Sequence, residues 1–196
     1  MTHTLHVLRP GPQDEQVLVE RLHQGEPDAF RALHERYFGR VFGVARQILR
    51  SESAAEDAAQ DVFVRVFKSI RRFRGDSSLA TWIHRITVNH CLSERTRAAR
   101  HLLGRNEPEI ENAPAPSSAL EDKVWLREVL ELFEHLSEDK RIAFYLHHVE
   151  GLSAHEIAVV MGGTRDAALK RLQRTRCELF ALWQRRVRRG SSEKAK

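Results

Sequence analysis

The chain has 196 residues, of which 41% are hydrophobic and 30% charged, and its formal net charge is +5. This length suits one folded domain or two small ones. Two isolated cysteines argue against a disulfide framework, and the N-terminus lacks the apolar core of a signal peptide. No apolar run approaches the ~18 residues of a membrane span. We therefore expect a cytoplasmic protein with no direct membrane insertion.

The positive charge is concentrated in two separate parts of the chain. Residues 65–105 contain ten Lys or Arg against two Asp or Glu, and residues 165–189 contain nine against two. The rest of the chain is acidic. Two separate basic blocks favour two contacts with one polyanionic polymer over a uniformly basic surface.

The first half of the chain is expected to be helical. Residues 1–15 are interpreted as a loose tail, and helical periodicity then runs from Glu15 to about His101. Ser51 or Ser53 can cap one helix, and Asp76 or Ser77 can cap the next after a break at residues 73–78. The apolar stripes of the three predicted helices are Phe30, Leu33, Tyr37, Val41, Val44, Ile48 and Leu49; Val62, Phe63, Val66, Phe67 and Ile70; and Leu79, Trp82, Ile83, Ile86 and His90.

A second helical unit follows residues 104–118, which contain three prolines and are predicted to form a linker. Ser118 and Glu121 can form a capping box that starts a new helix. The chain is thus predicted to be all-α, with two small helical domains joined by a flexible linker. The apolar stripes of the second unit are Trp125, Val129, Leu132, Phe133 and Leu136, and then Ile142, Ala143, Leu146 and Val149.

Residues 152–176 have the form of a helix-turn-helix. Ser153 and Glu156 can form a capping box, Gly162-Gly163 breaks the first helix, and Thr164 can cap the second. The second helix is basic, which suits a nucleic-acid contact. Taken alone, this stretch also fits an αα-hairpin with a solvated basic face.

Three blocks in this order resemble the sigma-70 family of RNA polymerase initiation factors, and the short extracytoplasmic-function (ECF) group in particular. The sequence AEDAAQDVFVRVFKSI at 55–70 is similar to regions 2.1–2.2, and FRGDSSLATWIHRITVNHCLSERTR at 73–97 is similar to regions 2.3–2.4. LSEDKRIAFYLHHVEGLSAHEIAVVMG at 136–162 is similar to region 4. The resemblance covers residues 25–98 and 120–184.

This resemblance implies a sigma factor that binds core RNA polymerase and directs promoter-specific transcription initiation, in a stress or signal response. It implies an N-terminal extension (1–24), a region 2 domain (25–100), a linker (101–119), a region 4 domain (120–185) and a basic tail (186–196). The expected partners are the largest catalytic subunit and the flap region of the polymerase, promoter DNA, and an anti-sigma factor.

The resemblance also assigns residues to each contact. The polymerase-binding residues are Glu56, Asp57, Gln60 and Asp61, although a solvated acidic face is the plain alternative. The −10 DNA-binding residues are Arg72, Phe73, Arg74, Asp76, Ser77, Trp82, Arg85 and Asn89, where aromatic rings can stack on unpaired bases and arginines can neutralise phosphates. For Trp82 a purely structural role in the core is equally consistent with its neighbours. The −35 DNA-binding residues are Thr164, Arg165, Ala167, Ala168, Lys170, Arg171 and Arg174.

The predicted recognition helix departs from its family at two positions. Ala167 and Leu169 stand where relatives often have Thr and Lys, which removes a hydroxyl and a charge from the expected DNA face. We therefore expect duplex binding to persist and the −35 sequence preference to differ.

No catalytic residue, metal site or cofactor is expected. His147, His148 and His155 lack a Cys or carboxylate at zinc-like spacing, and no nucleophile triad or phosphate-binding loop is present. A stand-alone helix-turn-helix regulator is the main alternative function, but it leaves residues 55–97 unexplained. An enzyme acting on nucleic acid has only the basic blocks in its favour.

Overall fold

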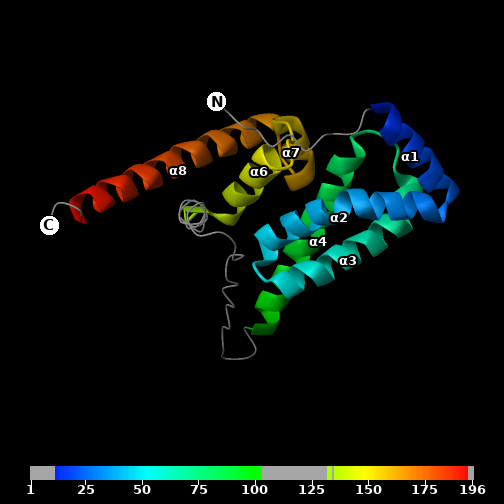
Figure 1. Ribbon diagram of the computed structural model, residues 1–196, viewed down its shortest axis with the longest axis horizontal. Coiled ribbons are helices and arrows are strands. Elements are labelled where there is room, and N and C mark those ends of the chain that lie inside the picture. Colours follow the sequence, from blue (N-terminus) through cyan, green and yellow to red (C-terminus); the bar gives the residue numbers. More distant parts are fainter. Residues whose placement is uncertain (1–11, 103–131, 134, 194–196) are drawn as a thin grey trace.

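The computed structural model describes residues 12–102, 132–133 and 135–193, and every regular element within these ranges is helical (Figure 1). The predicted all-α class is therefore confirmed. Most of the predicted linker, the Ser118–Glu121 capping box and the apolar residues Trp125 and Val129 lie outside the described residues.

Helix α1 (Pro12–Gln24) begins inside the stretch that was expected to be a loose tail. Proline at the first helical position, with Asp14 and Glu15 in the first turn, favours a helix start. Leu22 is fully buried in the core of the N-terminal unit, by which we mean helices α1 to α4. The tail prediction was thus wrong for residues 12–15, because it overlooked this start signal.

Helices α2 (Pro27–Leu49) and α3 (Glu52–Ser69) are joined by only two residues, Arg50 and Ser51. Arg50 ends α2 in the left-handed region with φ of 61°, and Ser51 caps α3 by accepting a hydrogen bond from the backbone of Ala54. The predicted stripes pack between these helices. Phe67 is the exception, with 60% of its surface exposed.

A short 3₁₀ turn, η1 (Ile70–Arg72), and the loop at 73–78 lead into helix α4 (Leu79–Leu102). The cap of α4 is Ser78, whose hydroxyl accepts from the backbone N–H of Thr81 at 3.2 Å. The backbone N–H of Leu79 donates to Glu15 of α1 at 2.7 Å. The predicted caps were wrong, because a cap side chain must reach an N–H two or three residues ahead and Ser78 has the right spacing.

The C-terminal unit contains α6 (Glu138–His148), α7 (Ala154–Met161) and α8 (Arg165–Glu193). Both hydrogen bonds of the predicted capping box between Ser153 and Glu156 are present. Gly162 and Gly163 adopt positive φ, and the Thr164 hydroxyl accepts from the backbone of Ala167 at 3.2 Å. The predicted helix-turn-helix is therefore confirmed as α7 and α8.

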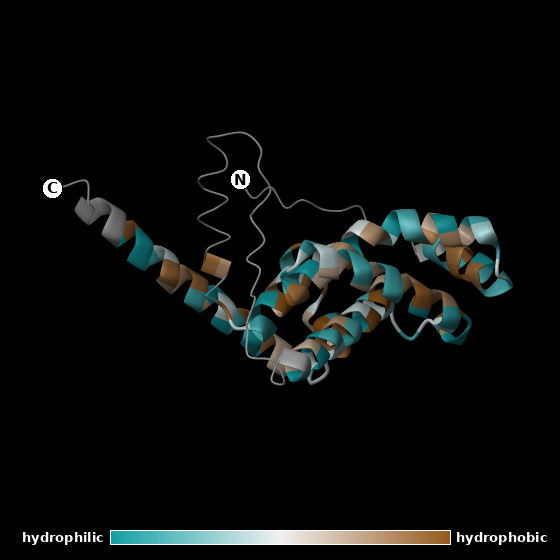
Figure 2. Cartoon of the chain, turned by 90° about the horizontal axis from the view of Figure 1, so that it is seen from below, coloured by the Kyte–Doolittle hydropathy of each residue, from teal (hydrophilic) through white to brown (hydrophobic). Residues whose placement is uncertain are grey.

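Helix α8 is longer than the sequence indicated. It continues without a break through the expected basic tail to Glu193, and its outer part projects away from the body of the molecule (Figure 1). Apolar residues continue along this projecting part (Figure 2), where Phe180 and Trp183 are 58% and 52% exposed.

The two units share one hydrophobic core. Val44, Ile48 and Val88 of the N-terminal unit belong to the same buried cluster as residues of α6, α7 and α8, including Ile142 and Ile157. Helix α7 lies against α4, and α6 lies against α2. We call this packing the closed arrangement. The prediction of two domains joined by a flexible linker did not include this shared core.

Candidate nucleic-acid interface

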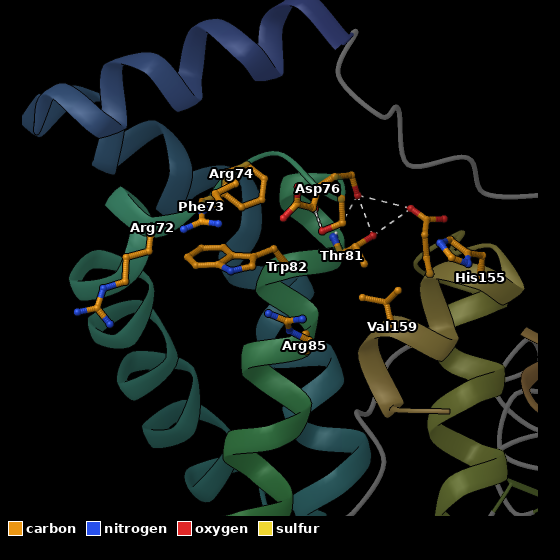
Figure 3. A pocket seen from close by; sticks show the side chains of 12 residues that line it. Arg72, Phe73, Arg74, Asp76, Thr81, Trp82, Arg85, His155 and Val159 are labelled. Atoms are coloured by element: carbon orange, nitrogen blue, oxygen red, sulfur yellow. Dashed lines mark hydrogen bonds between the residues drawn. The ribbon is translucent and has the colours of Figure 1, made fainter. Parts of the chain in front are cut away.

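The loop at 73–78 and the first turns of α4 border a pocket of about 340 Å³ (Figure 3). Seven of the eight residues predicted to contact unpaired DNA line it. Asn89 does not: it is exposed on α4, four residues beyond Arg85. The pocket-lining members of the predicted set are Arg72, Phe73, Arg74, Asp76, Ser77, Trp82 and Arg85.

An aromatic pair forms one side of this pocket. The rings of Phe73 and Trp82 lie 5.2 Å apart between centroids, at an angle of 49°. Phe73 is 8% exposed, and Trp82 is partly buried against the core of the N-terminal unit. Trp82 thus packs against the core and also borders the pocket, so its two possible roles are compatible. This geometry provides a ring face on which a base could stack.

Positive charge surrounds the aromatic pair. The side chains of Arg72, Arg74 and Arg85 are exposed. Figure 3 shows Arg85 below Trp82, and it shows the side chain of Arg72, at the end of η1, pointing away from α4. Exposed guanidinium groups around an aromatic face suit the binding of a single nucleic-acid strand. The guanidinium groups can bind the phosphates while the aromatic face stacks on the bases.

The opposite wall of the pocket comes from helix α7. The helix itself was predicted, but its position beside this pocket was not. His155 and Val159 lie across the pocket from the loop and α4 (Figure 3), and Glu156 also lines the pocket. The Glu156 carboxylate accepts hydrogen bonds from the hydroxyls of Thr81 at 3.0 Å and Ser78 at 3.5 Å. These contacts join residues at least 75 positions apart, so no local signal could have revealed them.

A second candidate surface lies on helix α3. The four residues predicted to bind a protein partner are all exposed: Glu56, Asp57, Gln60 and Asp61. Val64 and Phe67 follow them at helical spacing and are 49% and 60% exposed. The ring of Phe67 lies beside that of Phe30, with centroids 4.6 Å apart. Exposed apolar side chains bordered by carboxylates are typical of a protein-binding surface.

Phe67 was not predicted to belong to this surface. Its spacing from Phe63 and Val66 placed it in the buried stripe, yet 60% of its surface is exposed, whereas Val62 and Val66 are fully buried. Beside the same surface, His90 is buried with Nε2 3.6 Å from Asp61. Burial and the nearby charge of Arg65 lower the pKa of His90, while Asp61 opposes that shift.

The third candidate surface is the first half of α8. Five of the residues predicted to bind −35 DNA are exposed: Thr164, Arg165, Ala167, Lys170 and Arg174. Ala168 is not available for DNA contact, because it is 1% exposed and belongs to the shared core. Arg171 is partly buried, with Nη2 3.5 Å from Asp139 of α6.

The histidines considered for metal binding make other contacts. The ring of His148 lies 4.1 Å from that of Phe144, and a ring nitrogen of His147 is hydrogen-bonded to the Leu152 carbonyl at 2.8 Å. Among the residues that the structure describes, no group of three or more His, Cys, Asp or Glu could hold a metal ion. In the same part of the chain, no helix is both long and apolar enough to cross a membrane.

Comparison with known proteins identifies both units. Residues 33–101 match the family model of sigma-70 region 2, and residues 126–179 match that of sigma-70 region 4. The ECF RNA polymerase sigma-E factor of Haemophilus influenzae is 32% identical over 181 residues, which are 83% of this chain and 91% of the relative. The RNA polymerase sigma-H factor of Pseudomonas aeruginosa is 30% identical over 167 residues, or 76% and 83% of the two chains.

A solved structure has the same fold. The sigma factor RpoE of Bartonella quintana, determined in complex with the anti-sigma factor NepR, aligns with a TM-score of 0.68 at 23% identity. The alignment covers 79% of this chain and 96% of that chain.

Proposed function

The chain belongs to the ECF group of the sigma-70 family of RNA polymerase sigma factors, and from that membership we propose a role for each of its three surfaces. A sigma factor binds core RNA polymerase and directs it to promoters. The polymerase carries out the reaction, so we propose no catalytic role for this chain. We place it in the cytoplasm, where its polymerase acts.

The α3 surface is proposed to dock on the largest catalytic subunit. Its exposed carboxylates would orient the encounter, because complementary charge increases association rates more than it increases final affinity. Val64 and Phe67 would supply the apolar part of the contact, which the acidic residues alone lack. The C-terminal unit is proposed to contact the flap region.

The pocket beside Phe73 and Trp82 is proposed to hold an unpaired base of the −10 element. Extruding a base costs a few kcal/mol, and stacking on an aromatic ring contributes about 1–3 kcal/mol per base. Arg74 and Arg85 would neutralise the adjacent phosphates. The convergence of rings and guanidinium groups on one pocket is the observation that carries this assignment.

Helix α8 is proposed to enter the major groove at the −35 element. Arg165, Lys170 and Arg174 are exposed on the half of the helix that follows the turn, as a recognition helix requires. Phosphate contacts would position the helix, and base-edge contacts would set the sequence preference. Ala168 has no part in this contact.

An anti-sigma factor is the remaining proposed partner. The Bartonella quintana neighbour was determined with one, and a protein that covers the α3 surface or the pocket would restrain this chain in the same way. We propose that release from such a partner accompanies a stress or other signal. A stand-alone regulator is not favoured, because it would need neither the pocket nor the α3 surface.

Run-off transcription with purified core polymerase tests the proposal. On promoter fragments from the same genome, we expect transcripts that start at fixed positions only when the chain is added. Core polymerase alone and core with heat-denatured chain serve as controls. Transcription equal to that of core alone, with no co-purification of chain and core, would contradict the proposal.

A further inference from the structure

His84 and His90 of α4 are both buried, but their polar surroundings differ. Nε2 of His84 lies 3.1 Å from the carboxylate of Glu150, within hydrogen-bond distance. Neither ring nitrogen of His90 has a hydrogen-bond partner among the residues that the structure describes. Buried polar groups in folded proteins are normally hydrogen-bonded, and an exception needs its own explanation. The burial of His90 is therefore not accounted for by a hydrogen bond.

A carboxylate of the α3 surface lies beside this histidine. Nε2 of His90 is 3.6 Å from Oδ2 of Asp61, which is beyond a normal hydrogen bond but within reach of a small movement of the carboxylate. The side chain of His90 is 2% exposed, whereas that of Asp61 is 67% exposed. The pair thus connects the interior of the N-terminal unit with the surface that is proposed to bind the polymerase.

The position of the Asp61 carboxylate depends on whether His90 carries a proton. Both nitrogens of a protonated histidine are donors, and a charge-assisted hydrogen bond to a carboxylate has a length of roughly 2.7–2.9 Å. This is shorter than the 3.6 Å that separates the two groups here. Protonation would therefore draw the Asp61 carboxylate inward, toward α4. With neutral His90, the same carboxylate stays at the surface, where a cationic side chain of a partner can reach it.

The charges around His90 come from both helices that flank it. Arg65 of α3 and Arg97 of α4 disfavour its proton, whereas Asp61 of α3 and Glu94 of α4 favour it. Burial has the largest influence, and together with Arg65 it holds the pKa of His90 below the usual 6.5. Near neutral pH His90 is therefore neutral. Asp61 makes the largest of the contributions that favour the proton.

This balance couples the proton on His90 to partner binding at Asp61. A cation of the partner placed beside Asp61 would cancel the contribution that favours the proton, so the pKa of His90 would fall further in the complex. Binding then releases protons over the range in which His90 is partly protonated. By linkage, the affinity for the partner decreases as the pH falls through this range.

We propose that His90 is a positioning residue for the polymerase contact, because its protonation state decides whether the Asp61 carboxylate stands at the α3 surface or turns inward. Association with core polymerase is strongest when His90 is neutral. This inference rests on the proposed docking of the α3 surface for its consequence. The coupling between His90 and Asp61 is a property of the chain alone, so it can be measured without polymerase.

A titration of the free chain measures the coupling. The ring ¹⁵N signals of the eleven histidines can be followed by NMR from pH 8 to pH 5, and a His90→Gln chain identifies the signal of His90. We expect Asp61→Asn to lower the midpoint of His90 by roughly 0.5–1 pH unit. Asp57→Asn is the matched control, because Asp57 is exposed one turn earlier on α3 and is not among the charges that act on His90.

Binding to core polymerase measures the consequence. Between pH 7.5 and pH 5.5, we expect the unsubstituted chain to lose roughly threefold more affinity than a His90→Phe chain, because half a pH unit in a midpoint corresponds to about that factor. His90→Gln, which also lacks a titrating group, should behave like His90→Phe. Asp57→Asn should lower the affinity at every pH and leave its pH dependence unchanged. Circular dichroism at both pH values checks that each chain is folded.

Each result has a separate meaning. Equal His90 midpoints in the Asp61→Asn and Asp57→Asn chains would overturn the coupling. A coupled pair with the same pH dependence of binding in the unsubstituted and both His90 variants would overturn the positioning role, as would a loss in those variants that is equal at every pH. If the unsubstituted chain does not bind core polymerase at any pH, the proposed function is contradicted, and the titration still decides whether His90 and Asp61 are coupled.

Discussion

The carboxylate of Glu156 accepts a hydrogen bond from the hydroxyl of Thr81, and it also completes the capping box of α7 with Ser153. One side chain therefore starts a helix in the C-terminal unit and contacts the N-terminal unit. Stability of the helix-turn-helix and packing of the two units are coupled through this residue.

Removal of the Thr81 hydroxyl tests that coupling. We expect Thr81→Val to lower the free energy of unfolding by about 1–2 kcal/mol, because Glu156 loses a donor in a partly buried site. Thr87→Val is the control: Thr87 is equally buried on α4, but its hydroxyl donates only to the Ile83 carbonyl of its own helix. Urea denaturation of both variants measures the difference. Equal losses would show that the contact between units contributes nothing.

The contacts of Glu150 predict that the stability of the folded chain depends on pH. Burial alone would raise the pKa of Glu150, but the hydrogen bond and charge of His84, with the charge of Arg40, outweigh burial and hold that pKa below its usual value of 4.5. A lowered pKa stabilises the folded chain above pH 4.5, and this stability is lost as the pH falls through the lowered value.

Glu150→Gln isolates this contribution. Near neutral pH we expect the substitution to cost about 3 kcal/mol of unfolding free energy, because Arg40 and His84 lose a buried charged partner. Thermal unfolding from pH 7 to pH 3 should show the gap between the two chains narrowing below pH 4.5. A constant gap across that range would contradict the assignment.

The two cysteines should differ in reactivity. Burial, followed by the nearby charge of Glu94, raises the pKa of Cys91 to about 12, whereas Cys177 is exposed on α8. We expect a thiol reagent to titrate one cysteine in the native chain and two in denaturant. Mass spectrometry should place the native label on Cys177. Rapid labelling of both would show that the shared core is open in solution.

Trp82 is expected to act at the strand-opening step. Trp82→Ala should shorten the lifetime of the open promoter complex by roughly tenfold or more, because a stacking surface is lost. Trp82→Phe keeps a ring and should restore part of that lifetime. Since Trp82 also packs on Phe73, melting temperatures must be compared. A loss confined to duplex binding at the −35 element would contradict this role.

Substitutions in the recognition helix are expected to change its DNA sequence preference. Ala167→Thr with Leu169→Lys places a hydroxyl and a charge at exposed positions of α8. We expect altered −35 preference in a promoter selection experiment, with a salt dependence of DNA binding that is steeper by about one phosphate contact. Co-purification with core polymerase should be unchanged. Loss of polymerase binding would mean that this helix has another partner.

Features with local causes were predictable from the sequence. The capping box of Ser153 and Glu156, the break at Gly162 and the Thr164 cap each depend on residues within four positions of one another. The convergence of Phe73, Trp82 and Arg85 followed from one loop and the helix after it.

Features with distant causes were not predictable from the sequence. The spacing of Phe67 matched a buried stripe, but the packing of the folded chain leaves 60% of its surface exposed. No sequence signal at Ala168 distinguishes an alanine in the core from one that faces DNA. In the sequence, Glu150 is an ordinary charged residue next to a glycine. Its partners Arg40 and His84 are 110 and 66 residues away, so only the folded chain shows that it is a buried, paired carboxylate.

The shared core limits how freely the C-terminal unit can be exchanged between relatives. A chimaera that keeps α1 to α4 and takes region 4 from another sigma factor would retain Arg40, His84 and the narrow space at Gly43. That glycine lies against the hydroxyl of Tyr145 in α6. Unless the donor supplies a carboxylate and a ring that fit those positions, its promoter preference would be transferred without the packing between the two units. The interface therefore depends on both regions together, and neither region alone would carry it into a chimaera.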